Sequence, residues 1–102
     1  MRAALMTGVR APLEMTDISD PVPGVDGVVV RVEASGVCRS DWHVWNGSDP
    51  VALPLVLGHE FCGEVVAVGA NVQRWRVGDQ VISPFILACG ACPSCARGEQ
   101  TT

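Results

Sequence analysis

The sequence contains no lysine, and its basic residues are seven arginines spread from Arg2 to Arg97. Eleven acidic residues outnumber them, so the formal net charge is −4 at pH 7. Binding to nucleic acid depends on clustered basic side chains that neutralise phosphates. The scattered arginines therefore argue against a nucleic acid as the partner.

The chain also lacks a long apolar segment. Its longest stretch without charge, Gln80 to Ala96, has 17 residues and is broken by two prolines and a glycine, which is too short and too polar for a membrane span. The apolar run near the N-terminus ends before Arg10 and is shorter than the core of a signal peptide. We therefore expect a cytoplasmic protein with no membrane contact. Five cysteines in such a protein favour free thiols or metal ligands over disulfides, and an odd number cannot all pair internally.

Helical periodicity is nearly absent, and no internal repeat or low-complexity linker is evident. With 48% hydrophobic residues in 102, the composition predicts one packed core rather than a disordered chain. Short runs that suit strands are separated by turn sequences rich in Gly, Pro, Asn and Asp. These runs are Arg2 to Met6, Leu13 to Ile18, Val28 to Ala34, Glu64 to Val68 and Gln80 to Ser83. The spacing predicts a mainly β fold, a small and partly open antiparallel barrel.

Two local patterns are more specific. In residues 28–33, three valines alternate with Val29, Arg31 and Glu33, which predicts a strand with one buried face. Residues Ser40 to Trp45 predict a short helical turn, with Ser40 as the N-cap and Asp41 at the positive end of the helix dipole.

The first chemical cluster runs from Cys38 through Ser40 and Asp41 to His43. A thiolate near a strand end can bind a soft metal, and the hydroxyl of Ser40 and imidazole of His43 could pass a proton to water. Taken alone, the cluster has an alternative interpretation, because a free cysteine is often a small core residue.

The second cluster is Gly58-His59-Glu60, followed by Gly63 and Gly69. Its alternative interpretation is a solvated turn that enters a strand. The glycines, however, set the backbone freedom around the His-Glu pair in a specific pattern. Cys62 has neither the spacing nor the neighbours of a ligand, and we expect it to be buried and inert.

The third cluster is Cys89, Cys92 and Cys95, spaced three residues apart in a loop rich in Gly and Pro. A tight loop of this kind can aim several sulfurs at one metal ion. An iron–sulfur cluster is the rival interpretation. The bacterial ferredoxin pattern would place its next cysteine four residues after Cys95, where the sequence has Glu99 with no proline after it.

The second cluster resembles the signature of the zinc-containing medium-chain alcohol dehydrogenases. That signature is Gly-His-Glu, two residues, Gly, five residues, Gly, two residues and a small aliphatic residue, here Val72. The family also carries an upstream cysteine followed by Arg or His, Ser or Thr, and Asp, with a histidine downstream, and residues 38–43 are similar to this element. Two motifs thus agree in order and spacing. The fold implied is the GroES-like catalytic domain with a cysteine-rich zinc lobe over about residues 85–102.

The resemblance implies a role for each matching residue. Cys38 and His59 would be ligands of a catalytic zinc, with Glu60 beside the metal and a later cysteine as the third ligand. Asp41 would orient the ligating histidine.

The resemblance also implies a route for the alcohol proton and a contact to the cofactor. Ser40 would accept the proton, and His43 would pass it to solvent. Arg39, with His43 nearby, would contact the cofactor, the arginine at its pyrophosphate. Cys89, Cys92 and Cys95 would bind a structural zinc whose fourth cysteine falls at position 103.

The activity implied is hydride transfer from a small alcohol to NAD or NADP, or the reverse reaction on an aldehyde or ketone, with zinc as the Lewis acid. No Gly-x-Gly-x-x-Gly occurs, so the Rossmann domain is expected outside residues 1–102. We therefore expect the first part of a catalytic domain, inactive alone and a homo-oligomer when complete.

Two other functions remain as alternatives. A non-enzymatic GroES-like barrel would not need the cysteines or His59, and a zinc-free quinone reductase would lack these ligands. The aromatic residues near the site, Trp42, Trp45 and Phe61, would either shape an apolar pocket or belong to the core.

Overall fold

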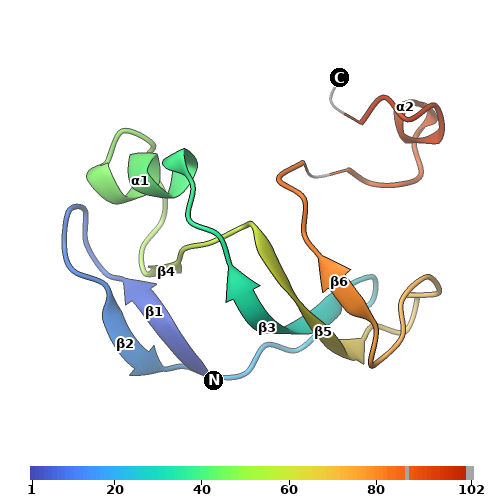
Figure 1. The fold of residues 1–102 in the computed structure, drawn as a ribbon, viewed down its shortest axis with the longest axis horizontal. Coiled ribbons are helices and arrows are strands. Elements are labelled where there is room, and N and C mark those ends of the chain that lie inside the picture. Colours follow the sequence, from blue (N-terminus) through green and yellow to red (C-terminus); the bar gives the residue numbers. More distant parts are fainter. Residues whose placement is uncertain (87, 101–102) are drawn as a thin grey trace.

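The computed structural model describes residues 1–86 and 88–100. The described residues form a mainly β fold with two short helices, in the order shown in Figure 1. The elements are β1 (Arg2–Met6), β2 (Glu14–Asp17), β3 (Val28–Ser35), α1 (Arg39–Asn46), β4 (Leu55–Val56), β5 (Phe61–Val68), β6 (Gln80–Ile82) and α2 (Pro93–Ala96). The five predicted strands are all present. The clearest differences are that β5 begins three residues earlier than predicted and that β4 and α2 were not expected.

The strands form two antiparallel sheets of three strands each. One has the order β2-β1-β4 and the other β3-β5-β6, and the two stand side by side in Figure 1. Within the described residues no strand pair joins the two sheets, so the barrel is open. This confirms the prediction of a partly open antiparallel barrel.

The hydrophobic core of the described chain is small. Ala3, Met6 and Val65 are its buried apolar residues. An open cavity of about 690 Å³ lies between the sheets, with Ala4 and Leu13 on one side and Val30 and Phe61 on the other. The inner faces of the two sheets are therefore only partly covered.

The prediction that β3 has one buried face is wrong for this chain. Val28 is 36% exposed and Val32 is 54% exposed. Val30 and Val32 line the open cavity between the sheets, so the inner face of β3 is incompletely covered. The pairing with β5 adds an extra residue to β3 only between Val32 and Ala34, after these valines, so it is not the cause of their exposure.

Helix α1 begins earlier than the sequence predicted. Its N-cap is Cys38, in an extended conformation, and not Ser40. The carboxylate of Asp41, at the third helical position, accepts a hydrogen bond of 2.8 Å from the Cys38 backbone N–H. This bond is the half of a capping box in which the side chain of the third helical residue satisfies the backbone N–H of the N-cap residue. The helix ends at Gly47, whose φ of 85° is the left-handed conformation that glycine adopts most easily.

The two unpredicted elements are too short to have a sequence period. Strand β4 exists through its pairing with β1, where Leu55 lies opposite Met6 and Val56 opposite Leu5. Helix α2 is a single turn that starts at Pro93, directly after Cys92. Proline at the first helical position is favourable, because its missing N–H would have no partner there.

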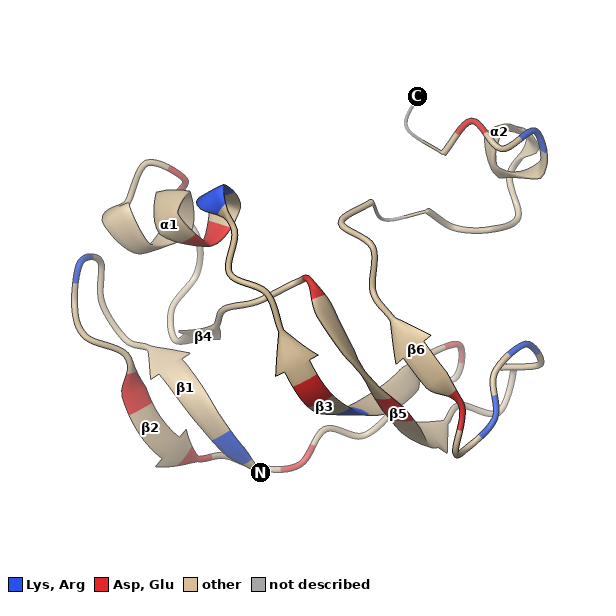
Figure 2. Ribbon diagram, viewed as in Figure 1, with Lys and Arg blue, Asp and Glu red and all other residues tan. Residues whose placement is uncertain are grey.

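Charged residues are dispersed over the molecule, and Figure 2 shows the arginines on well-separated segments. Arg2 lies in β1, Arg31 in β3 and Arg39 in α1. Neither helix in the described part of the chain is long or apolar enough to cross a membrane.

Candidate functional site

The pairing of β3 with β5 brings the first two clusters together. Ser35 lies opposite Phe61 at the end of the antiparallel pair, and the backbone N–H of Gly36 donates to the carbonyl of Glu60 at 2.7 Å. Cys38 follows the end of β3 and His59 precedes the start of β5. Because the two strands are antiparallel, both residues lie at the same end of the strand pair. Residues 21 positions apart in the sequence thereby become neighbours.

The donor atoms at this edge converge. Cys38 Sγ lies 3.0 Å from His59 Nε2, and Ser40 Oγ lies 2.8 Å from the sulfur and 3.2 Å from the nitrogen. A sulfur and a nitrogen bound to one tetrahedral zinc stand about 3.6 Å apart. Ligand atoms of Cys38, His59 and Glu60 all lie within 4.8 Å of one another. This donor set fits a zinc ion.

The electrostatics of this site favour the ligand form of the cysteine. The hydrogen bond with Ser40 is the main cause that lowers the pKa of Cys38, and hydrogen bonds from backbone N–H groups and His59 act in the same direction. The hydrogen bond and charge of Cys38, with the charges of Asp41 and Glu60, raise the pKa of His59. Both shifts favour a thiolate at Cys38, which is the form that binds zinc, and metal binding would displace the proton from His59 Nε2.

Asp41 is the one buried charged residue among those described, with 7% of its surface exposed. Its Oδ2 holds the backbone N–H of Cys38, and its charge raises the pKa of His59. The hydrogen bonds of the described residues include none between Asp41 and His59. The structure therefore places Asp41 as a support for the Cys38 backbone, while its expected effect on the histidine is through charge.

The other expected site residues of α1 gather around Trp42. The guanidinium of Arg39 lies 5.2 Å from the centre of the Trp42 ring, and the His43 ring meets it edge-on at 5.3 Å. No hydrogen bond joins His43 to Ser40 among residues 1–86 and 88–100. The roles of Arg39 in cofactor binding and of His43 in proton transfer stay predictions.

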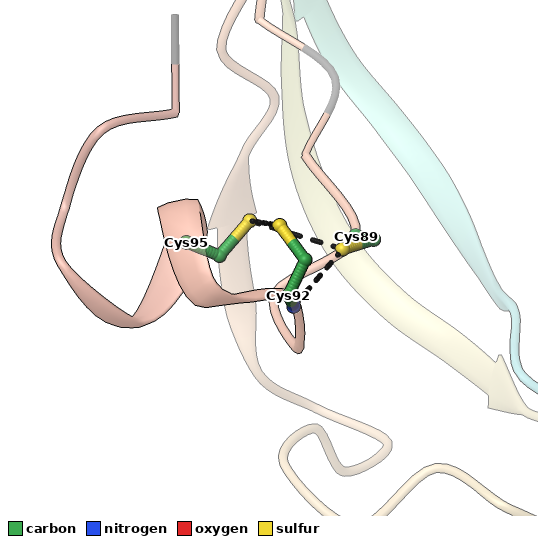
Figure 3. Close-up of side chains that lie close together, drawn as sticks. All are labelled: Cys89, Cys92 and Cys95. Atoms are coloured by element: carbon green, nitrogen blue, oxygen red, sulfur yellow. Dashed lines mark hydrogen bonds between the residues drawn. The ribbon is translucent and has the colours of Figure 1, made fainter. Parts of the chain in front are cut away.

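The three cysteines of the third cluster point their sulfurs toward one another (Figure 3). The Cys89 and Cys92 sulfurs lie 3.8 Å and 3.5 Å from that of Cys95. Two sulfurs on one tetrahedral zinc with bonds of about 2.3 Å stand about 3.8 Å apart. The donor set therefore fits zinc with one ligand still to be supplied. Of the predicted lobe, residues 87, 101 and 102 lie outside the described chain.

The cysteines of the lobe differ in pKa. Hydrogen bonds from the backbone N–H groups of Ala91 and Cys92 lower the pKa of Cys89 to about 7. The hydrogen bond with Cys92 is the main cause that raises the pKa of Cys95. Cys89 is therefore the first of these two thiols to become a thiolate as the pH rises.

The remaining aromatic and cysteine predictions have mixed outcomes. Trp45 donates from Nε1 to the carbonyl of Ala11 at 2.8 Å, so it anchors α1 to the loop after β1. Phe61 lines the cavity between the sheets, whereas Trp42 is 48% exposed. Cys62 belongs to neither of the two metal-ligand groups, as expected, but it is half-buried and not buried. The reason is that the face of β5 on which it lies is incompletely covered.

Two residues at the site were not predicted from the sequence. Phe85 meets the His59 ring edge-on, with 5.2 Å between ring centres. Gly36 lies against the side chain of Glu60. The motifs contain no signal for either contact, because both arise where segments distant in sequence meet.

Comparison with known proteins gives the same result as the geometry. Residues 24–102 match the family model described as the alcohol dehydrogenase GroES-like domain. An L-threonine 3-dehydrogenase of Saccharopolyspora erythraea is 43% identical over 98% of this chain and 30% of its own length.

Two solved structures are similar in fold as well as in sequence. A cobalt- and zinc-bound alcohol dehydrogenase of Pyrobaculum aerophilum is 32% identical, with a TM-score of 0.85 over 98% of this chain and 31% of its own. An alcohol dehydrogenase of Escherichia coli, solved with NADH, is 34% identical, with a TM-score of 0.78 over 98% and 29%. The chain thus spans about a third of the length of these relatives. It belongs to the alcohol dehydrogenase GroES-like domain family, the N-terminal domain of the zinc-dependent medium-chain alcohol dehydrogenases.

Proposed function

We propose that the complete protein is a zinc-dependent dehydrogenase that transfers a hydride between a small alcohol and NAD or NADP. The observation that carries the proposal is the convergence of Cys38 Sγ, His59 Nε2 and Ser40 Oγ within 3.2 Å. A soft sulfur, an imidazole and a hydroxyl at one point supply two zinc ligands and one proton acceptor.

In this proposal Cys38 and His59 hold the zinc with a cysteine from beyond residue 102, and Glu60 stands beside them. Zinc, when bound, acts as a Lewis acid that lowers the pKa of the alcohol hydroxyl. Ser40 accepts the hydroxyl proton as its own proton passes on toward His43, and its position beside both ligands suits that relay. His43, three residues further on α1, lies on the same side of the helix and delivers the proton to solvent.

The cofactor site is shared with a second domain. Arg39, exposed at the start of α1, contacts the pyrophosphate of the nicotinamide cofactor as a charged donor. We expect a Rossmann domain after residue 102 to bind the rest of the cofactor. The relative solved with NADH supports this requirement. We further propose that residues 1–102 are the first part of the catalytic domain and that the complete enzyme is a cytoplasmic homo-oligomer.

The lobe of Cys89, Cys92 and Cys95 binds a second, structural zinc in this proposal. The sulfurs of Cys89 and Cys92 already lie at tetrahedral spacing from that of Cys95, and a fourth thiolate completes the set. The relative solved with cobalt and zinc supports metal binding in this family. Neither a non-enzymatic barrel nor a zinc-free reductase would require two such donor sets, so these alternatives are less well supported.

The proposal is tested with the complete protein and a panel of primary and secondary alcohols. We expect His59→Ala to abolish turnover while retaining much of the NAD or NADP affinity, because metal and cofactor are bound mainly by different domains. Cys38→Ser should lose one zinc per chain. Cys62→Ser is the matched control and should keep both zinc ions, since Cys62 lies in neither cluster. Full activity of His59→Ala would contradict the proposal.

A second assay tests the two-domain arrangement. Residues 1–102 alone should show no turnover with any alcohol, because hydride transfer needs a nicotinamide held against the substrate. Turnover by this piece would contradict the proposed division of labour between domains.

A further inference from the structure

Glu60 has an unusual position beside the metal site. It is exposed, yet one of its carboxylate oxygens lies within 4.8 Å of the ligand atoms of both Cys38 and His59. A carboxylate on a flexible side chain can occupy many positions. The Glu60 carboxylate can stand near the two ligands only if no neighbouring side chain fills that space.

That room is at Gly36. A Cβ at position 36 would lie 2.8 Å from Glu60 Oε2 and 3.3 Å from Glu60 Cβ. The first distance is shorter than any ordinary van der Waals contact, so the two groups cannot both keep these positions. The carboxylate of Glu60 stands where a side chain of residue 36 would begin.

The backbone at this point has little freedom to yield. The Gly36 N–H donates to the Glu60 carbonyl at 2.7 Å, and the neighbouring pair Ser35 and Phe61 is in register within the sheet. The φ of Gly36 is not in the positive range, so alanine can adopt its conformation. A side chain at position 36 would therefore displace the far end of Glu60 and leave the strands in place.

We propose that Gly36 is a positioning residue for the metal site: its missing side chain admits the Glu60 carboxylate to the Cys38–His59 donor set. The inference rests on the proposed function, since it needs a metal at that site. It assigns to Gly36, two residues before Cys38, a role in the metal's environment, separate from any need for backbone freedom.

The test uses cobalt as a spectroscopic probe in the complete protein. The lobe is unaltered in all variants, so its absorption cancels in the difference between variant and wild type. We expect Glu60→Ala and Gly36→Ala each to alter the visible bands of cobalt at the Cys38–His59 site and to weaken its binding about tenfold. The double variant should bind no more weakly than Glu60→Ala alone, because both changes remove the same carboxylate.

Gly24→Ala is the matched control. A Cβ at position 24 would contact nothing within 4 Å, so its cobalt spectrum, cobalt affinity and melting temperature should equal those of wild type. We expect Gly36→Ala to melt within a few degrees of this control. A loss of cobalt affinity by Gly36→Ala that persists in the Glu60→Ala background would overturn the proposal, because the effect would then pass through the backbone.

Two further outcomes separate the inference from the function on which it rests. An unchanged cobalt spectrum in Gly36→Ala, with wild type binding cobalt at both sites, would overturn the role of Gly36 alone. Failure of wild type to bind metal at Cys38 and His59 would overturn the proposed function and this inference together.

Discussion

Cys38 is held in place by three hydrogen-bond partners. Its backbone N–H is held by Asp41, and its sulfur lies against Ser40 and His59. Two of these partners, Asp41 and Ser40, lie within one helical turn of Cys38, and the third, His59, directly precedes β5. The sulfur is therefore positioned before any metal binds, which reduces the entropy lost on binding.

The cap on α1 can be tested through Asp41. Replacing Asp41 with Ala leaves the Cys38 N–H, which is shielded by the helix start, without a partner and should lower the free energy of unfolding by about 1–2 kcal/mol. Asp41→Asn keeps a carbonyl acceptor and should cost less. Chemical denaturation of the complete protein measures both. Equal losses in the two variants would contradict a role as hydrogen-bond acceptor.

The pKa values in the lobe predict an order of thiol reactivity. With zinc removed by a chelator, Cys89 should react with iodoacetamide at half its maximal rate near pH 7, because the thiolate is the nucleophile and the pKa of Cys89 is about 7. Cys95, whose pKa is raised, should require a higher pH. Mass spectrometry locates the modified residue. Restoring zinc should protect both thiols, and faster modification of Cys95 would contradict the predicted order.

At the scale of elements, the pairing of β3 with β5 positions the metal site. The two strands are eight residues each, and the site lies at the end of the pair where β3 ends and β5 begins. A one-residue slip would move His59 away from Cys38 and turn its neighbours to the other face. The register of this pair therefore matters more to the site than any single contact within it.

Gly63 tests that register. A Cβ at position 63 would lie 2.1 Å from the carbonyl oxygen of Arg31 in β3, so the strands would have to separate. We expect Gly63→Ala to lower the free energy of unfolding by at least about 2 kcal/mol and to weaken metal binding at Cys38 and His59. Gly24→Ala serves again as the unobstructed control. A fully stable Gly63→Ala variant would contradict the close approach.

The lobe that contains Cys89, Cys92 and Cys95 has little secondary structure. Its helix is four residues long, and none of those residues is buried. We expect the complete protein to contain two zinc ions per chain and Cys92→Ser to contain one, as measured by metal analysis. Two ions retained after this change would mean that the lobe is not a metal site.

At the scale of the whole molecule, the described chain leaves much apolar surface exposed. Ile82 is 79% exposed and Phe85 is 64% exposed, and an open cavity separates the two sheets. Such surfaces in a stable protein are usually covered by further chain or by a partner.

This exposure predicts how residues 1–102 behave alone. The isolated piece should bind a hydrophobic dye such as ANS and increase its fluorescence several-fold more, per mole, than the complete protein does. Denaturant titration should show a weakly cooperative transition, because three buried apolar residues form a small core. Dye binding no greater than that of the complete protein would contradict this prediction.

Much of the site was predictable because its parts are local. Cys38 to His43 and Gly58 to Glu60 each place their chemistry within six residues, and the cysteines of the lobe are three residues apart. Spacing in the sequence then constrains spacing in the structure. The strands were predictable for the same reason, since Arg2 to Met6 and the valines from residue 28 have the composition of strands.

The sequence by itself determined the donor atoms, the strand-rich character and the family of this protein. Only the tertiary structure decided that β3 and β5 pair with two register shifts, and that Gly36 meets Glu60 and Phe85 meets His59. Each of these depends on the register between segments 20 or more residues apart, and a local pattern contains no information about how distant strands align.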